Sequence, residues 1–300
     1  MIYDYKKLHS QIRDFLQDKG GKEIQHIGKT LDSLVFGFKL DERLVCKCVI
    51  KDYGIRVWKE VEVLDQLYTQ NSCEYLATPI NKWEIDEPHM LHTLVLYVFP
   101  RYDYSLDTYH VNSGQDHSIE LTRQLFVALS ALHTMGYYHG DLKPLNICVH
   151  DSKIRLIDYG TTGIYESLCP YRKNSIGWCT PVQFIKMVRK CVQTPASPLL
   201  KVMDAMQSFI VKKYGYSDEL HEDPKANDEF VASMISVYMQ TGRNFWEYNA
   251  DSELYDNIIV MMNNIALFLG DPEKYIANFR VEIDVTKMLG VLKKTSLIEN

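Results

Sequence analysis

The apolar residues of this 300-residue chain change their spacing near Pro100, and that change limits the fold more than any other feature. Before Pro100, the stretches 34–40, 43–50 and 91–99 have the apolar, β-branched and aromatic content that predicts three strands. Between the second and third strands, apolar residues at helical spacing predict one helix: Val57, Val61, Leu64 and Tyr68. The front of the chain therefore reads as strands with one helix.

Beyond Pro100 the pattern is mainly helical. Ser118 is a candidate N-cap, and the leucines that follow it at helical spacing are Leu121, Leu125, Leu129 and Leu132. A predicted hairpin formed by 147–149 and 153–157 interrupts the helices. We therefore expect an α+β fold with a strand-rich domain at 1–99 and a helical domain at 100–300, and ligand pockets favour such junctions.

Composition narrows the functional classes. A formal net charge of −6 gives no electrostatic support for nucleic-acid binding. The longest apolar run, 258–269, is shorter than a membrane span and contains Asn263 and Asn264, so a buried helix is expected. Seven scattered cysteines indicate reduced thiols and a cytoplasmic location, with Cys46 and Cys48 as small core residues of one strand.

The strongest chemical signal is the run 138–146, Tyr-His-Gly-Asp-Leu-Lys-Pro-Leu-Asn, with Asp158-Tyr159-Gly160 beginning 12 residues after Asn146. These residues resemble the eukaryotic-type protein kinases, whose catalytic loop reads HRDxKxxN and whose metal motif reads DFG. The resemblance implies a two-lobed fold, with a small β-rich N-lobe that carries one helix and a larger, mainly helical C-lobe. It also implies a protein substrate, ATP, and Mg²⁺ with Mn²⁺ as an alternative.

Within this resemblance each polar residue takes a role in phosphoryl transfer, which depends on positioning and charge neutralisation. Asp141 is implied as the catalytic base that accepts or orients the hydroxyl proton. Lys143, two residues later, is implied to contact the transferring phosphate. Asn146 and Asp158 are implied as metal ligands, because Mg²⁺ prefers oxygen atoms and phosphates supply the remainder.

The segment 27–35 resembles the glycine-rich loop GxGxxGxV of the family but keeps only Gly28 and Val35. Thr30 and Ser33 replace the second and third glycines. Both residues are small, so the loop is still expected to cover ATP, with looser phosphate contact and a raised ATP requirement.

The segment 45–47 resembles the VAIK strand, and Lys47 is implied to bind the α- and β-phosphates. A lysine on an apolar strand needs a charged partner. Glu60 and Glu62 compete for that position, and they lie about 200° apart on a helix, so only one can face inward. Glu60 lies on the apolar side, four residues before Leu64, and is the predicted partner.

The region after Asp158 resembles an activation segment in which only Pro181 of the family's APE motif is kept. Ser175 and Lys143 match positions typical of serine/threonine kinases. Gly140 stands where many members carry an arginine that reads a phosphate on this segment. We therefore expect serine/threonine specificity and activity without phosphorylation of the segment.

Asp228 opens a segment similar to the family's central helix, where the aspartate bonds the backbone of the catalytic loop. The stretch 183–227 is longer than the family usually has there, and its apolar residues are Leu199, Val202, Met203, Met206, Phe209 and Ile210. Two interpretations of this stretch remain open: an extra helix that packs on the C-lobe, or a docking site for a substrate or a protein partner.

Two other functions remain open from the sequence. His-Gly-Asp-Leu also resembles small-molecule phosphotransferases that act on aminoglycosides or choline, whereas Lys143 and Asp228 favour a protein kinase. The altered glycine loop is also seen in pseudokinase scaffolds. The chain's divergence is similar to that of kinases encoded by large DNA viruses, which would place it in the host cytoplasm.

Overall fold

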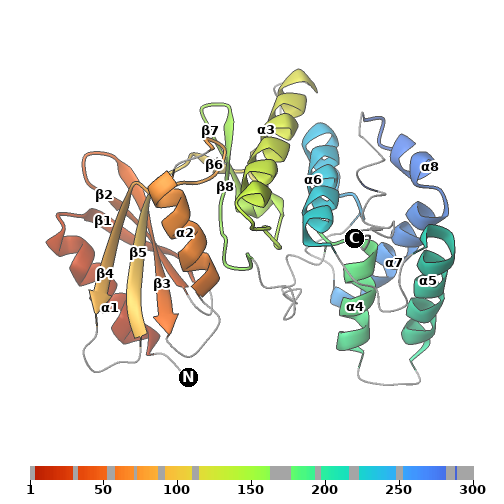
Figure 1. Cartoon of the computed structure of the whole chain (residues 1–300), viewed down its shortest axis with the longest axis horizontal. Helices are drawn as coiled ribbons and strands as arrows, with labels where there is room; N and C mark the ends of the chain where they lie inside the picture. The colour runs from red at the N-terminus through yellow and green to blue at the C-terminus, as the bar shows by residue number, and fades with distance from the viewer. Residues whose placement is uncertain are drawn as a thin grey trace, which may run out of the picture.

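The computed structural model describes residues 4–29, 33–52, 58–70, 73–86, 92–109, 115–162, 177–192, 197–215, 223–247, 253–281 and 288. The described residues form two lobes, one built on an antiparallel sheet and the other mainly helical (Figure 1). This is the two-lobed α+β architecture that the sequence predicts.

The N-terminal sheet contains five strands in the order β1-β2-β3-β5-β4, and neighbouring strands are antiparallel. Their bounds are β1 (Lys22–Lys29), β2 (Ser33–Lys39), β3 (Arg43–Asp52), β4 (Asn81–Asp86) and β5 (His92–Pro100). The predicted strands correspond to β2, β3 and β5. The edge strands β1 and β4 were not predicted from the sequence. Most residues of β1 are exposed, and the apolar residues of β4 are limited to Trp83 and Ile85, which leaves little apolar alternation to detect.

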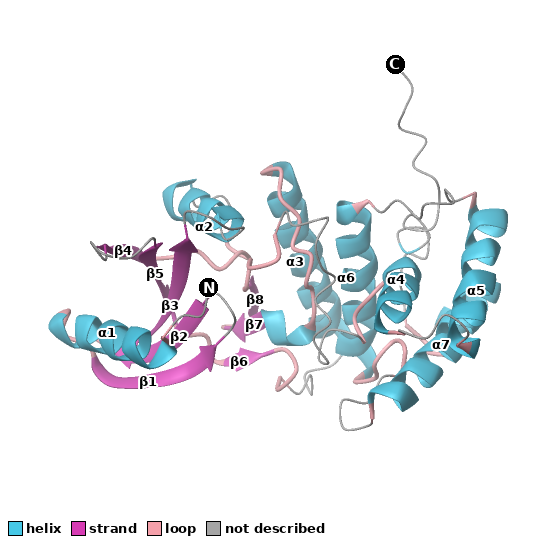
Figure 2. Cartoon of the chain, turned by 90° about the horizontal axis from the view of Figure 1, so that it is seen from below, coloured by secondary structure: helices cyan, strands magenta, loops and turns pink. Residues whose placement is uncertain are grey.

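Helices cover both faces of this sheet. Figure 2 separates α1 (Tyr5–Asp18) from α2 (Trp58–Gln70), which lies on the opposite side of the strands. Helix α1 was not predicted from the sequence, although its buried residues Leu8, Ile12 and Leu16 recur every four positions. They join an outer apolar cluster that contains Cys46 and Cys48 of β3, so the two cysteines are core residues as expected.

The second helix follows its predicted apolar stripe with one correction. Val61 and Leu64 are buried, whereas Tyr68 is 40% exposed and Leu67 takes the inward position. Leu67 and Tyr68 lie three and four residues after Leu64, and both spacings can keep a side chain on one face of a helix. Here the residue at the spacing of three is the one that is buried. Val57 lies outside the described residues.

The helical lobe contains α3 (Gln115–Thr134), α4 (Pro181–Cys191), α5 (Pro198–Tyr214), α6 (Pro224–Thr241), α7 (Leu254–Gly270) and α8 (Pro272–Ala277). The prediction that Ser118 caps a helix is wrong, because α3 begins three residues earlier. Ser118 is buried, and its hydroxyl donates to the Met239 carbonyl of α6 at 3.1 Å. The run 258–269 lies in α7, and none of the helices in the described part of the chain could cross a membrane.

A small sheet lies beside α3 between the two lobes (Figure 1) and consists of β6 (Tyr104–Ser105), β7 (Ile147–His150) and β8 (Lys153–Leu156). Strands β7 and β8 form the predicted hairpin. The Ala77 N–H donates to the Leu156 carbonyl at 2.9 Å, so the hairpin is tied to the segment that leads into β4. This connection places the loops at both ends of the hairpin at the junction of the lobes.

The long stretch 183–227 contains most of α4 and all of α5. Four of the six apolar residues noted on α5 are buried, namely Leu199, Met203, Met206 and Ile210. Val202 and Phe209 are exposed instead. The stretch is therefore at least an additional packed helix of this lobe.

Candidate active site

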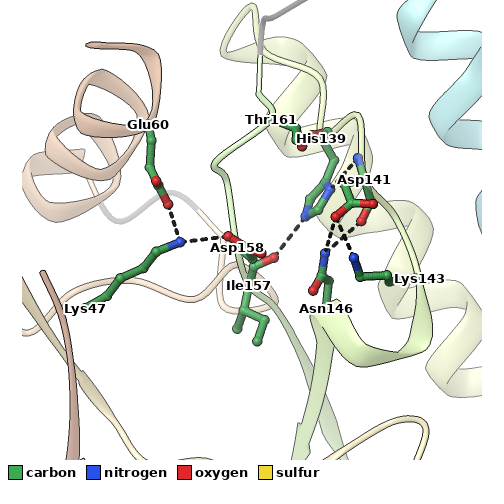
Figure 3. A network of polar contacts seen from close by, with 9 residues as sticks. All are labelled: Lys47, Glu60, His139, Asp141, Lys143, Asn146, Ile157, Asp158 and Thr161. Carbon is green, nitrogen blue, oxygen red and sulfur yellow. Dashed lines mark hydrogen bonds and ion pairs between the residues drawn. The ribbon is translucent and has the colours of Figure 1, made fainter. Parts of the chain in front are cut away.

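A short loop ahead of β7 brings three predicted site residues together (Figure 3). The Lys143 ammonium donates to Asp141 Oδ2 at 2.7 Å, and Asn146 Nδ2 donates to the Asp141 carbonyl at 2.8 Å. A single turn of 3-10 helix, η1 (Pro144–Asn146), carries Asn146 back toward Asp141. All three side chains are buried, so water competes little for the hydrogen bonds within the cluster.

The backbone of this loop is held by Asp228 of α6. Its carboxylate accepts the N–H of His139 at 2.7 Å and that of Gly140 at 3.0 Å. His133 Nε2 lies 3.0 Å from the same carboxylate. Gly140 has a φ of +77°, a conformation that favours glycine. The predicted structural role of Asp228 agrees with these contacts.

His139 is fully buried and joins the loop to the segment after β8. Its Nδ1 accepts the N–H of Asp141 at 3.3 Å, so its Nε2 must carry the hydrogen that it shares with the Ile157 carbonyl at 2.9 Å. Thr161 donates from its hydroxyl to the His139 carbonyl at 2.9 Å. These bonds indicate that His139 is a structural residue, which holds the loop against the segment after β8.

Lys47 of β3 connects the two lobes electrostatically. Its ammonium donates to Glu60 of α2 and, at 2.7 Å, to Asp158 Oδ1 (Figure 3). Glu60 is buried and Glu62 is exposed, so the structure pairs Lys47 with the predicted partner. Asp158 has a φ of +64°, which is uncommon for a residue other than glycine and is often found at functional sites.

The charges in this cluster stabilise one another. Burial alone would lower the pKa of Lys47, but the adjacent charges of Asp158 and Glu60 outweigh it and raise that pKa above its ordinary value. The charge of Lys47 in turn holds the pKa of Asp158 well below its ordinary value. Lys47 therefore stays cationic and Asp158 anionic at neutral pH.

A cleft of 330 Å³ opens beside these charges at the junction of the lobes. Lys47, Glu60, Asn146 and Asp158 form its polar side, and its main apolar lining is Ile27, Val35, Val45, Leu64, Phe99 and Cys148. Of this apolar set, only Val35 was expected from the sequence to contact ATP. The alternation of β3 could have indicated Val45, because residues two apart on a strand share a face. The cleft therefore suits a ligand with an apolar part, which would contact the apolar lining, and a charged part, which would contact the polar side.

The glycine-rich segment is described only in part, since Thr30 lies outside the described residues. Gly28 is the partner of Val35 across β1 and β2, and a Cβ at Gly28 would meet Val35 at an ordinary 3.7 Å. Ser33 is buried and lines the cleft. In this arrangement Gly28 needs neither a positive φ nor a bare backbone, so its expected closeness to phosphate stays a prediction.

Asn146 and Asp158 also have the donor chemistry that a hard divalent cation needs. The Asn146 amide nitrogen is committed to Asp141, which leaves its Oδ1 as the ligand atom. The Lys47 ammonium donates to Oδ1 of Asp158, which leaves Oδ2 of the Asp158 carboxylate to bind a cation. Both side chains line the same cleft, and the set fits Mg²⁺ with phosphates and water completing the shell.

The end of the activation-like segment becomes the start of α4. Thr180 caps this helix by accepting the Gln183 N–H at 3.2 Å, and Pro181 occupies its first turn. Val182, in place of the family's glutamate, is fully buried among apolar residues. Ser175 lies outside the described residues.

Comparisons with known proteins point to one family, although no family model matches the chain. It is 26% identical over 145 residues to a probable casein kinase II subunit alpha homolog of Encephalitozoon cuniculi. It is 38% identical over 85 residues to a probable cell division protein kinase of the same organism, and 44% identical over 48 residues to cyclin-dependent kinase F-4 of Oryza sativa subsp. japonica. The matches cover 47%, 27% and 16% of this chain, and 43%, 32% and 10% of those relatives.

Proposed function

We propose that this chain, which is similar over parts of its length to eukaryotic-type protein kinases, transfers the γ-phosphate of ATP to serine or threonine hydroxyls of a protein substrate. One observation carries the proposal. Lys47, paired with Glu60 and Asp158, lines a cleft that Asn146 also lines, and the Asn146 amide donates to the carbonyl of the buried Asp141, whose carboxylate pairs with Lys143.

The residues of the chain have distinct tasks in this proposal. The apolar lining of the cleft takes the adenine, and Lys47 binds the α- and β-phosphates. Asp141 orients and accepts the proton of the attacking hydroxyl, while Lys143 neutralises charge on the transferring group. The 2.7 Å contact between the Lys143 ammonium and the Asp141 carboxylate supports this division of tasks, because it brings a cation next to the proposed base.

Asn146 and Asp158 would hold Mg²⁺, which when bound supplies positive charge against the phosphates. In the arrangement seen here, Asp158 is bonded to Lys47. Entry of a nucleotide would therefore place phosphate oxygens between these two side chains. Their mutual contact keeps both charged groups ordered before the ligand arrives.

We further propose that residues 1–99 act as the N-lobe and 100–300 as the C-lobe, with the boundary at the end of β5. The family resemblance and Lys143 support serine/threonine specificity. Val202 and Phe209 are exposed on α5, the additional helix of this lobe, and they support a partner that docks on 183–227.

The test is a transfer assay with radiolabelled ATP, Mg²⁺ and a mixed protein acceptor, run beside Asp141→Ala and Asp158→Ala. Label on serine or threonine that is lost in both variants supports the proposal. Parallel reactions with aminoglycosides and choline cover the small-molecule alternative. Absence of transfer to any acceptor, with ATP still bound, would indicate a scaffold.

A further inference from the structure

A polar cluster between α2 and the sheet, formed by Asp65, Lys82 and Tyr97, lies outside the cleft and continues the row of polar side chains that begins at Lys47. Lys47 on β3 lies directly opposite Tyr97 on β5, and Tyr97 lies directly opposite Lys82 on β4. Directly opposed residues of neighbouring strands share one face of a sheet. The three side chains therefore form a row across the sheet on the face that α2 covers.

Helix α2 supplies a matching acceptor for each member of this row. Glu60 accepts from Lys47, and Asp65 accepts from both Tyr97 and Lys82. Tyr97 donates to Asp65 Oδ1 at 2.7 Å, and the Lys82 ammonium lies 2.8 Å from the same atom. The five positions between Glu60 and Asp65 correspond to about 7.5 Å along a helix axis. The helix is therefore fastened to the sheet at two separated points.

The burial of these groups indicates which of the two contacts with Asp65 stabilises the position of α2 more. The Tyr97 side chain is fully buried, and its hydroxyl also lies 3.3 Å from the Val61 carbonyl of α2. Burial raises the pKa of Tyr97 well above its ordinary value, so the hydroxyl stays a donor. The pair of Lys82 with the half-exposed Asp65 is worth less alone, because exposed ion pairs are screened by water.

Lys82 orients the acceptor that Tyr97 uses. It lies between Asp65 and Glu84, with Glu84 Oε1 at 3.0 Å. Burial alone would lower the pKa of Lys82, but its bonds to both carboxylates raise it. The lysine therefore remains charged and fixes the Asp65 carboxylate against the tyrosine hydroxyl.

We propose that Tyr97, Asp65 and Lys82 are positioning residues that hold α2 inward, so that Glu60 stays bonded to Lys47. The inference rests on the proposed kinase function and deepens it. None of the three touches the cleft, and they act through α2, a rigid element that carries Glu60. This second anchor lies outside the activation-like segment, so the support it gives to α2 does not depend on a phosphate in that segment.

The test uses the full chain with Tyr97→Phe, Asp65→Asn, Glu60→Gln and the double variant Tyr97→Phe/Glu60→Gln. Loss of one hydrogen bond predicts a fall in kcat/KM for ATP of about twofold to tenfold in Tyr97→Phe and Asp65→Asn. Because Tyr97 acts through Glu60, adding Tyr97→Phe to Glu60→Gln should produce little further loss. Glu62→Gln, an exposed carboxylate of the same helix, is the matched control and should resemble the wild type.

If Tyr97 had only a general structural role, the reductions in kcat/KM of the two single variants would multiply in the double variant, and that result would overturn the inference. Full activity of Tyr97→Phe would overturn it as well. Amide hydrogen exchange of residues 58–70 tests the anchor without requiring kinase activity, so the anchor and the proposed function can fail separately. If the wild type transfers no phosphate, the proposed function fails, yet Tyr97→Phe should still speed exchange across α2 relative to Glu62→Gln. Equal exchange in those two variants would reject the anchor.

Discussion

Removal of the Asp228 carboxylate should destabilise the protein strongly, although this residue lies outside the cleft. In Asp228→Ala the N–H groups of His139 and Gly140 lose acceptors at 2.7 and 3.0 Å, in a site where Asp228 is 3% exposed. A hydrogen bond to a charged group contributes about 1.5–3 kcal/mol, so two such bonds amount to about 3–6 kcal/mol. Domains of ordinary stability have only about 5–15 kcal/mol in total.

Urea unfolding followed by tryptophan fluorescence measures this loss, because Trp246 is fully buried and its indole N–H donates to the Cys179 carbonyl at 2.9 Å. Asp223→Ala removes the N-cap of the same helix, where Asp223 accepts the Lys225 N–H at 2.9 Å, and should cost only about 1 kcal/mol. A loss of about 1 kcal/mol or less in Asp228→Ala would refute the reasoning.

Three further predictions follow from the same contacts. Lys47 lowers the pKa of Asp158, so their pair stabilises the fold at pH values above the ordinary carboxyl pKa of about 4. This contribution is lost as the pH falls toward the pKa of Asp158 in the folded protein. Asp158→Asn should therefore flatten the acid side of a curve of unfolding free energy against pH. Ile12→Ala, in a fully buried position of α1, should cost about 2–5 kcal/mol in urea unfolding. Gly140→Ala should cost at least about 1–2 kcal/mol by the same assay, because φ is +77° and the new Cβ would lie 3.2 Å from the Thr161 carbonyl oxygen.

The sequence was most informative where chemistry and local spacing coincide. Asp141, Lys143 and Asn146 lie within six positions, so a tight loop was bound to bring them together. The choice between Glu60 and Glu62 needed only helical periodicity and agrees with the structure. Nucleotide and metal roles of these residues stay predictions, since they depend on ligand atoms rather than on the chain.

Long-range packing was harder to anticipate. Ser118 has the chemistry of a helix cap, yet it serves the contact between α3 and α6, which no local pattern reveals. Strands β1 and β4 lie at the edges of the sheet and contain few apolar residues, so the apolar alternation that predicts a strand is weak in both. The anchor at Tyr97 depends on the register of three strands, and register is set by the assembled sheet.

The most direct test of phosphotransferase activity compares wild type with Asp141→Asn, a change that preserves shape but removes the carboxylate. The initial rate of γ-phosphate transfer from ATP to a protein acceptor should fall by about 10²- to 10⁴-fold, as expected when a general base is lost. Urea unfolding of the variant establishes that it is folded. Equal transfer rates for the two folded proteins would contradict the assignment of this cleft as a kinase active site.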